Sequence, residues 1–355
     1  MRLKKVYFMK IRTFLVSCFV LLHFLFPHLS PAQDINEILA KMIEANFLAS
    51  YEGTLTTVLI NAPLTKIYRY KIVNYGSYHR REELLTDGIN KEINFDDGKY
   101  LWRFFPSKNL VIKERSRISS PIHFRIQKNF DLLKQNYEIQ VIGEYNINTR
   151  SGYKLLFKPK KSDRPQQIFW IDAKSGIPFK IEKYGPDNKL VSLSSFSKIR
   201  FIVPKKKKGA FLMVPPHTKI TEVKEEDNLS VEKAANLMGN QIFFPQYLPS
   251  GFTLKDIVLR FHGIKDKEKV LQFFYTDGLS AISIFQKKYR PEDNVGTSPS
   301  MVKIKLDGKE AFLSTSGTLN IVNINSHPLN ITLMGDVFKE ELIKVAQSLK
   351  PKSTN

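Results

Sequence analysis

Between residues 51 and 201, apolar and polar side chains alternate with a period of two. This pattern predicts β-strands that bury one face and expose the other. Glycine, proline, asparagine and aspartate divide the region at turn signals, which are Asp87-Gly88, Asp97-Gly98, Asp172 to Gly176 and Pro186 to Asn188. Short strands joined by such turns form antiparallel hairpins. We therefore expect a strongly curved antiparallel sheet or partial barrel.

Two stretches have helical spacing instead. Asp34, followed by Glu37 three residues later, is typical of a helix start. The apolar residues of this stretch recur at i, i+3 and i+4 and are Ile35, Ile38, Leu39, Met42 and Ile43. A second helix is predicted between Pro121 and Gln135, with apolar residues Ile122, Ile126, Phe130 and Leu133. Both helices are expected to cover the sheet.

The last third of the chain predicts a smaller antiparallel sheet with one helix. Residues 270–275 and 279–285 flank Thr276-Asp277-Gly278, where the Asp-Gly pair would supply the positive φ angles of a tight hairpin. An amphipathic helix is expected before Pro351, with apolar residues Phe338, Leu342, Val345, Ala346 and Leu349. The chain is long enough for two domains with separate cores.

Residues 204–239 separate the two regions and predict a charged linker. Four consecutive lysines occupy positions 205–208, and residues 224–228 read KEEDN. Such a composition solvates better than it packs. A phosphate-binding patch at a membrane surface is the alternative interpretation of the lysines. The predicted boundaries are 33–203 for the first domain and 240–350 for the second.

The first 32 residues are typical of a signal peptide. A basic start precedes the apolar run from Thr13 to Phe26, and Ser30-Pro31-Ala32 offers a cleavage site. About 14 helical residues span only ~21 Å, too short for the hydrocarbon core of a bilayer. We expect cleavage near Ala32 and export to the periplasm. Cys18, the only cysteine, lies in a lipobox-like sequence but within the apolar run, so we assign it to the removed segment.

Charge narrows the choice of partners. The net charge of +21 falls by the five basic residues of the signal peptide to +16. This favours anionic partners such as lipid head groups or acidic protein segments. Nucleic acid is not expected as a partner of an exported protein. A generally basic proteome would give the same charge without any functional consequence.

Sequence signatures of catalysis and cofactor binding are missing from the chain. It has no G-x-S-x-G, H-E-x-x-H, P-loop or dinucleotide fingerprint. The histidines are scattered, without the i, i+4 spacing of metal ligands. We therefore predict a binding protein without catalytic residues, metal or cofactor. An exported hydrolase is the least favoured class.

Strand alternation predicts an aromatic inner surface on the first sheet. Tyr68 and Tyr70 share one face of a strand, and Trp102 and Phe104 share one face of another. Basic residues alternate with such positions, namely Arg69, Lys71, Arg103, Lys154 and Lys158. The inner surface is either an ordinary core or a cleft for an acyl chain, in which each buried methylene contributes about 0.8 kcal/mol.

Several segments in order resemble the RseB/MucB family of periplasmic regulators. Residues 34–55, reading DINEILAKMIEANFLASYEGTL, resemble the family's opening helix and strand. The resemblance continues through Arg80-Arg81-Glu82 and Ile168 to Asp172, then through Leu248 to Phe252. Its most specific part is Tyr275 to Phe285, reading YTDGLSAISIF. The sequence departs from the family pattern around Arg150 to Tyr153 and at Asp163 to Gln167.

Residues 97–102, DGKYLW, look more like the LolA and LolB lipoprotein carriers. The resemblances together imply an α+β fold, with an N-terminal LolA-like antiparallel half-barrel covered by helices and a smaller C-terminal sheet-and-helix domain. The runner-up function that they leave open is a LolA-like periplasmic carrier of lipid or lipoprotein.

The family resemblance implies a negative regulator of the envelope-stress sigma factor. Such a protein binds the periplasmic segment of a membrane anti-sigma factor, protects it from proteolysis and is released by lipid or lipopolysaccharide. We expect a lipid-binding site at Tyr68, Tyr70, Trp102 and Phe104, with phosphates at Arg80 and Arg81. The anti-sigma segment is expected at the second domain, at Tyr275, Asp277 and Phe285. Assembly into a homo-oligomer stays open.

Overall fold

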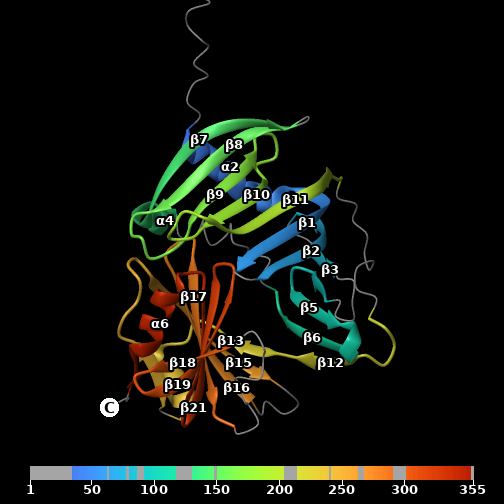
Figure 1. Cartoon of the computed structure of the whole chain (residues 1–355). Helices are drawn as coiled ribbons and strands as arrows, with labels where there is room; N and C mark the ends of the chain where they lie inside the picture. The colour runs from blue at the N-terminus through green and yellow to red at the C-terminus, as the bar shows by residue number, and fades with distance from the viewer. Residues whose placement is uncertain are drawn as a thin grey trace, which may run out of the picture. The chain divides into compact units, whose positions relative to one another are not determined.

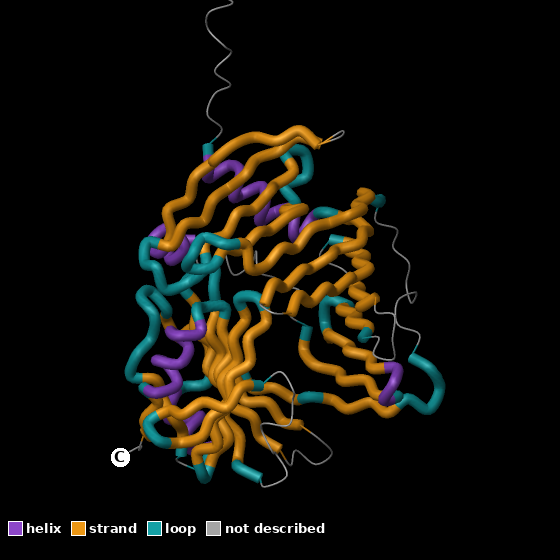
Figure 2. The backbone as a smooth tube through the Cα atoms, in the orientation of Figure 1, coloured by secondary structure: helices purple, strands orange, loops and turns teal. Residues whose placement is uncertain are grey.

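The computed structural model describes most of the chain after the predicted signal peptide (Figures 1 and 2). The described residues are 34–61, 64–76, 80–85, 92–116, 130–147, 150–203, 214–239, 241–262, 268–290 and 301–352. Residues 1–32, the predicted Asp87-Gly88 turn and most of the helix predicted between Pro121 and Gln135 lie outside the described residues.

The first sheet has twelve strands in the order β12-β6-β5-β4-β3-β2-β1-β11-β10-β9-β8-β7. Their bounds are β1 Ser50–Asn61, β2 Leu64–Tyr75, β3 Arg80–Leu85, β4 Ile93–Asp96, β5 Tyr100–Phe105, β6 Leu110–Arg115, β7 Tyr137–Ile147, β8 Arg150–Pro159, β9 Gln166–Asp172, β10 Pro178–Tyr184, β11 Leu190–Phe201 and β12 Lys219–Glu222. The pairings are antiparallel except that of β12 with β6. A single 3₁₀ turn, η1 (Pro106–Lys108), joins β5 to β6.

Helix α2 (Ile35–Leu48) begins where the sequence predicts it, and the Asp34 carboxylate accepts a hydrogen bond from the Asn36 amide at 2.9 Å. Ala45 of α2 packs in one cluster with Tyr51, Ile72 and Ile177 of the sheet region. Of the second helix predicted between Pro121 and Gln135, the described part lies in α4 (Phe130–Asn136), where Leu133 is fully buried.

The second sheet has eight antiparallel strands in the order β13-β15-β16-β17-β21-β20-β19-β18. Their bounds are β13 Lys224–Glu226, β15 Thr253–His262, β16 Glu268–Thr276, β17 Ala281–Lys288, β18 Val302–Leu306, β19 Lys309–Ser316, β20 Leu319–Ser326 and β21 Leu329–Gly335. Three further elements are a strand pair, β14 (Ile242–Pro245) with β22 (Leu349–Lys352), and the helices α5 (Val231–Leu237) and α6 (Lys339–Gln347).

One face of the eight-stranded sheet forms a continuous apolar core with α5 and α6. Fully buried members include Phe273 of β16, Ala234 of α5 and Leu342 of α6. Gln286 is also buried here, and its amide group both accepts a hydrogen bond from Phe243 N (2.8 Å) and donates one to Phe243 O (2.7 Å). This side chain therefore fixes β14 beside the core.

The predicted linker differs from what the structure shows. Its described part, 214–239, contains β12, β13 and α5 rather than a solvated tether. Ile220 of β12 lies opposite Val111 of β6, and the Ser230 hydroxyl caps α5 by accepting the Lys233 amide at 3.1 Å. Charged residues are common on edge strands, which is why this segment resembles a linker in sequence. The lysine run lies outside the described residues, and the domain boundaries stay predictions.

The predicted α+β fold class is confirmed. Apart from β12 and β13, which lie in the predicted linker, the strands of both large sheets come from the expected regions. The twelve-stranded sheet is open, because its end strands β12 and β7 do not pair with each other in the described chain. The two sheets also contact each other through described side chains. Lys183 of β10 forms an ion pair with Asp336, which follows β21.

Candidate functional site

The tip of the β16–β17 hairpin is held together by its own side chains. One oxygen of the Asp277 carboxylate, Oδ1, accepts hydrogen bonds from the Leu279 and Ser280 amides at 2.9 and 2.7 Å. The Thr276 hydroxyl donates to Ser280 O at 2.7 Å and accepts from Gly278 N at 3.1 Å. Only Gly278 of the Asp-Gly pair has a positive φ, +106°, so the prediction that both residues adopt one is wrong. The Asp277 side chain closes the turn instead.

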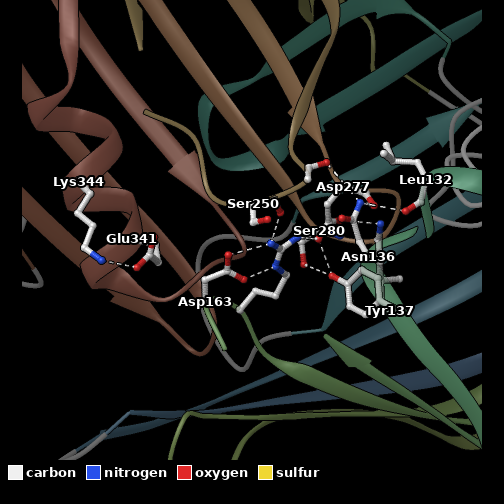
Figure 3. A network of polar contacts seen from close by, with 12 residues as sticks. Leu132, Asn136, Tyr137, Asp163, Ser250, Asp277, Ser280, Glu341 and Lys344 are labelled. Carbon is white, nitrogen blue, oxygen red and sulfur yellow. Dashed lines mark hydrogen bonds and ion pairs between the residues drawn. The ribbon is translucent and has the colours of Figure 1, made fainter. Parts of the chain in front are cut away.

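The second oxygen of Asp277, Oδ2, faces the region of the twelve-stranded sheet (Figure 3). It accepts a hydrogen bond from the Tyr137 hydroxyl at 2.7 Å and forms an ion pair with the Arg164 guanidinium. The Asp277 side chain is 0% exposed and the Arg164 side chain 2%. Asp277 of the eight-stranded sheet and Arg164 beside the twelve-stranded sheet therefore form a buried ion pair between the two sheet regions.

Arg164 lies in the connection between β8 and β9, where it bridges two carboxylates. Its Nε and Nη2 donate to the two oxygens of Asp163 at 2.5 and 2.9 Å, and Nη2 also donates to Ser250 O. Burial alone would lower the pKa of Arg164, but the hydrogen bonds with Asp163 and the charge of Asp277 raise it. The guanidinium is therefore fully charged and compensated on both sides.

Helix α4 closes the other side of the hairpin tip. Asn136 donates from Nδ2 to Leu132 O at 2.9 Å and to Asp277 O at 2.9 Å. The contact is so close that a Cβ at Gly278 would lie 2.7 Å from Leu133 N. We call the side chains of Asn136, Tyr137, Asp163, Arg164, Asp277 and Ser280, together with Ser250 O, the Asp277 network.

The ionisable groups of this network stabilise one another and are not available for catalysis. Burial and the Asp277 charge raise the pKa of Tyr137 well above its ordinary value, so the phenol stays protonated and donates to the carboxylate. Both oxygens of Asp277 and all guanidinium nitrogens of Arg164 are engaged. Within these described residues, neither a free base nor a free nucleophile is left for catalysis.

The three predicted partner-binding residues have different environments. Asp277 belongs to the Asp277 network, and Tyr275 is only 3% exposed in the core, with burial raising the pKa of its phenol. Phe285 of β17 is half-buried and lies on the face opposite the core. A partner can therefore reach Phe285 more directly than the other two.

Further apolar side chains share that face with Phe285. The strand register pairs Phe285 with Gln272 and Thr332, so their side chains point to the same side. The half-buried apolar residues on this face are Phe274, Phe285, Phe312, Ile321 and Met334. We call them the second face of the eight-stranded sheet.

The predicted lipid site is not assembled as expected. Tyr68 and Tyr70 share the face of Ile72, which packs near α2. Following the register from Tyr70 through β3 and β4 leads to Asn94 and then to Arg103 of β5. Trp102 and Phe104 therefore lie on the opposite face of the sheet. The prediction of one aromatic surface with Arg103 on its basic side is wrong. The register of each strand pair decides which residues of the next strand share a face, and here it places Arg103 on the face of Tyr70.

The other residues predicted to contact lipid are buried or already form hydrogen bonds and ion pairs within the protein. The Trp102 indole donates to the Asp97 carboxylate at 3.1 Å, and Phe104 is 8% exposed. Arg80 and Arg81 point to opposite faces and form ion pairs with Glu82 at 2.6 Å and Glu83 at 3.8 Å. A role of these residues in lipid binding stays a prediction.

Sequence reasoning missed the residues that hold Asp277. Arg164 stood out only as a departure from the family pattern, and Tyr137 and Asn136 carried no signal. Arg164 and Tyr137 are 113 and 140 positions away from Asp277 along the chain. The one usable hint was an Asp-Arg pair beside a proline between two strands.

The described part of the chain gives no sign of a metal site or of a membrane span. It brings together no group of three His, Cys, Asp or Glu side chains able to hold a metal ion. Its helices are also not both long and apolar enough to cross a bilayer.

Comparison with known proteins identifies the fold. The crystal structure of MucB in complex with MucA(peri) matches 90% of this chain and 100% of its own, at 17% identity and a TM-score of 0.55. The MucA/MucB complex of Pseudomonas aeruginosa matches 90% of this chain and 99% of its own, at 17% identity and a TM-score of 0.53. The two open sheets thus define a protein of the MucB fold.

The sequence comparisons define the family. Residues 34–210 match the model of the MucB/RseB N-terminal domain, and residues 242–349 match a domain of unknown function, DUF4367. The sigma-E factor regulatory protein RseB of Haemophilus influenzae is 22% identical over 224 residues, which are 61% of this chain and 65% of that protein. An uncharacterized protein of Methanocaldococcus jannaschii is 20% identical over 96% of this chain and 99% of its own. The chain belongs to the MucB/RseB family.

Replacing Asp277 by asparagine should destabilise the protein strongly. The substitution removes the charge that compensates buried Arg164, and breaking one side of a buried ion pair costs about 3–5 kcal/mol. The check is the free energy of unfolding from urea denaturation. Asp187→Asn is the matched control, since Asp187 also lies in a hairpin turn but pairs with Lys189 in solvent, and it should change stability by less than about 0.5 kcal/mol. Equal effects of the two substitutions would refute the role of the network.

Gly278→Ala should weaken the contact between the hairpin tip and α4. The new methyl group would lie 2.7 Å from Leu133 N and 2.9 Å from its Cα, and this backbone cannot yield easily. Gly308→Ala is the control, because Gly308 also has a positive φ, +80°, but a Cβ there meets nothing within 4 Å. We expect Gly278→Ala to lower the melting temperature several degrees more than the control does. A similar drop in both would show that backbone strain alone matters.

Proposed function

We propose that this protein is an exported negative regulator of sigma-factor signalling that binds the periplasmic segment of a membrane anti-sigma factor. It protects this segment from proteolysis and is released by lipid or lipopolysaccharide. The observation that carries the proposal is family membership combined with the match of both sheets to MucB crystallised with MucA(peri). Recognition without catalysis agrees with a network in which every charged group is already paired.

The second face of the eight-stranded sheet is the surface we propose for the anti-sigma segment. It combines half-buried apolar side chains with polar partners, and Thr332 donates to Asn323 at 2.6 Å in its centre. Phe285 lies between Gln272 and Thr332 on this face. Aromatic anchors within a polar surround are typical of the residues that dominate protein interfaces.

The Asp277 network connects this surface to the first sheet. Phe285 and Asp277 belong to the same hairpin, so the orientation of the second face depends on how its tip is held by Arg164 and Tyr137. A conformational change at the first sheet can reach the proposed partner site through this network, because the network holds the hairpin that carries Phe285. We propose the network as the mechanical link between the two sheets.

Lipid is proposed to act on the first sheet, at Tyr68 and Tyr70. Both side chains are half-buried, and the charged pair of Arg80 with Glu82 lies on the same face. Release of the partner by lipid requires negative coupling, and linkage requires that the anti-sigma segment weaken lipid binding by the same factor. A coupling of about 1–3 kcal/mol corresponds to a change in affinity of about 5- to 150-fold.

Phe285→Glu should weaken binding of the anti-sigma segment at least about tenfold, because it places a charge in the centre of the proposed interface. The measurement is a titration of the chain against the periplasmic segment of the anti-sigma factor from the same organism, with and without lipopolysaccharide. Val302→Glu on edge strand β18, where the side chain is 63% exposed, is the control and should bind normally.

Each outcome of this titration separates the candidate functions. Wild-type binding that lipopolysaccharide weakens supports the regulator. Binding that lipopolysaccharide leaves unchanged would remove the release step. Failure of the wild-type chain to bind the segment, with transfer of lipid between vesicles retained, would favour the carrier instead.

A further inference from the structure

The outer face of the twelve-stranded sheet carries a band of basic residues that the proposed function does not use. The register places Lys71 of β2 and Lys198 of β11 on either side of Thr54 of β1. Directly opposed residues in antiparallel strands point to the same face, so these two lysines stand on one surface. It is the face opposite the one that packs near α2, and β2, β1 and β11 lie side by side in Figure 1.

A second row of residues runs parallel to the first across six strands. In order from β2 to β8, the row is Arg69, Thr56, Ser195, Lys180, Trp170 and Lys154. The Trp170 ring lies between two ammonium groups, with Lys154 Nζ at 4.1 Å and Lys180 Nζ at 4.3 Å from its centroid. The indole N–H donates to Glu182 at 3.0 Å. These cation–π contacts hold the two lysine side chains on the outer face, next to the Trp170 ring.

The acidic residues of this face are already paired. Glu52 bridges Arg200 at 2.6 Å and Glu182 bridges Lys180 at 2.6 Å. Glu83, which lies opposite Lys71, bridges Arg81 instead at 3.8 Å. Four cations of the two rows form no ion pair within the described chain, namely Arg69, Lys71, Lys154 and Lys198. Their positive charge is available to an external anion.

Hydroxyl groups and apolar side chains complete the surface. Thr54, Thr56 and Ser195 lie between the cations and can donate hydrogen bonds to phosphate oxygens. Ile67, two residues from Arg69 on the same face, is 58% exposed, and Leu85, directly opposite Arg69, is 38% exposed. Unpaired cations beside exposed apolar side chains and an aromatic ring are the combination with which peripheral proteins bind an anionic bilayer.

We infer that the outer face of the twelve-stranded sheet docks on a bilayer surface of anionic phospholipid. The lipid phosphates contact Arg69, Lys71, Lys154 and Lys198, and Ile67 and Leu85 enter the interfacial region. Charge complementarity selects this occupant, because four unpaired cations form one surface on which Glu52, Glu182 and Glu83 are already paired. An exported chain also meets such a surface wherever it works. The inference does not depend on the anti-sigma function.

The test is co-sedimentation of the chain from Gln33 onward with vesicles, since residues 13–26 would bind lipid by themselves. Vesicles of phosphatidylglycerol mixed with phosphatidylcholine should retain the wild-type chain, less so at high salt, and phosphatidylcholine alone should not. Arg69→Gln combined with Lys71→Gln and Lys198→Gln should lower partitioning about 100-fold, because each cation near an anionic leaflet contributes about fivefold.

The matched control combines Lys255→Gln, Lys309→Gln and Lys350→Gln, exposed lysines outside the twelve-stranded sheet that give the same change in net charge. It should retain nearly wild-type partitioning. Equal losses in the two triple variants would overturn the inference in favour of net charge alone. Retention by phosphatidylcholine, or binding of an acidic peptide or soluble lipopolysaccharide but not of phosphatidylglycerol vesicles, would overturn it in favour of another ligand.

Discussion

The structure depends on one carboxylate that serves two purposes. The Asp277 Oδ1 oxygen closes the β16–β17 turn, and Oδ2 holds Arg164 and Tyr137 beside the first sheet. A buried ion pair is costly to form, because both charges lose their hydration, but leaving either charge alone is costlier still. The pairing therefore specifies how the hairpin meets the β8–β9 connection, even if its net contribution to stability is small. Asp163 and the Asn136 amide make that geometry more specific.

The two faces of each sheet differ in burial and in charge. The face of the first sheet near α2 is largely core, and its outer face carries the unpaired cations. In the second sheet, α5 and α6 cover the core face, and the second face with Phe285 is the apolar surface that we propose for the partner. The hairpin that carries Phe285 is also the one held by Arg164. The proposed binding surface on the second sheet and the contacts with the first sheet consequently share one structural element, the β16–β17 hairpin.

Local patterns in the sequence predicted most of the elements but not their long-range relations. The period of two, the turn residues and the α2 and α6 stripes act over a few positions, so the strands and helices could be read directly. Alternation within β5 shows that Trp102 and Phe104 share a face. It does not show whether these two side chains lie on the same side of the sheet as Tyr70. The match depends on the register through β3 and β4. The partners of Asp277 were missed for the same reason, because Arg164 is 113 positions away.

The central claim is that the Asp277 charge and the Arg164 charge stabilise the protein mainly through each other. A double-mutant cycle measures this directly, with Arg164→Met, Asp277→Asn and the double variant compared by chemical unfolding. The account predicts that each single variant is strongly destabilised and that the double variant recovers about 2–3 kcal/mol of the summed loss. A coupling energy near zero would contradict it, because the two charges would then act independently.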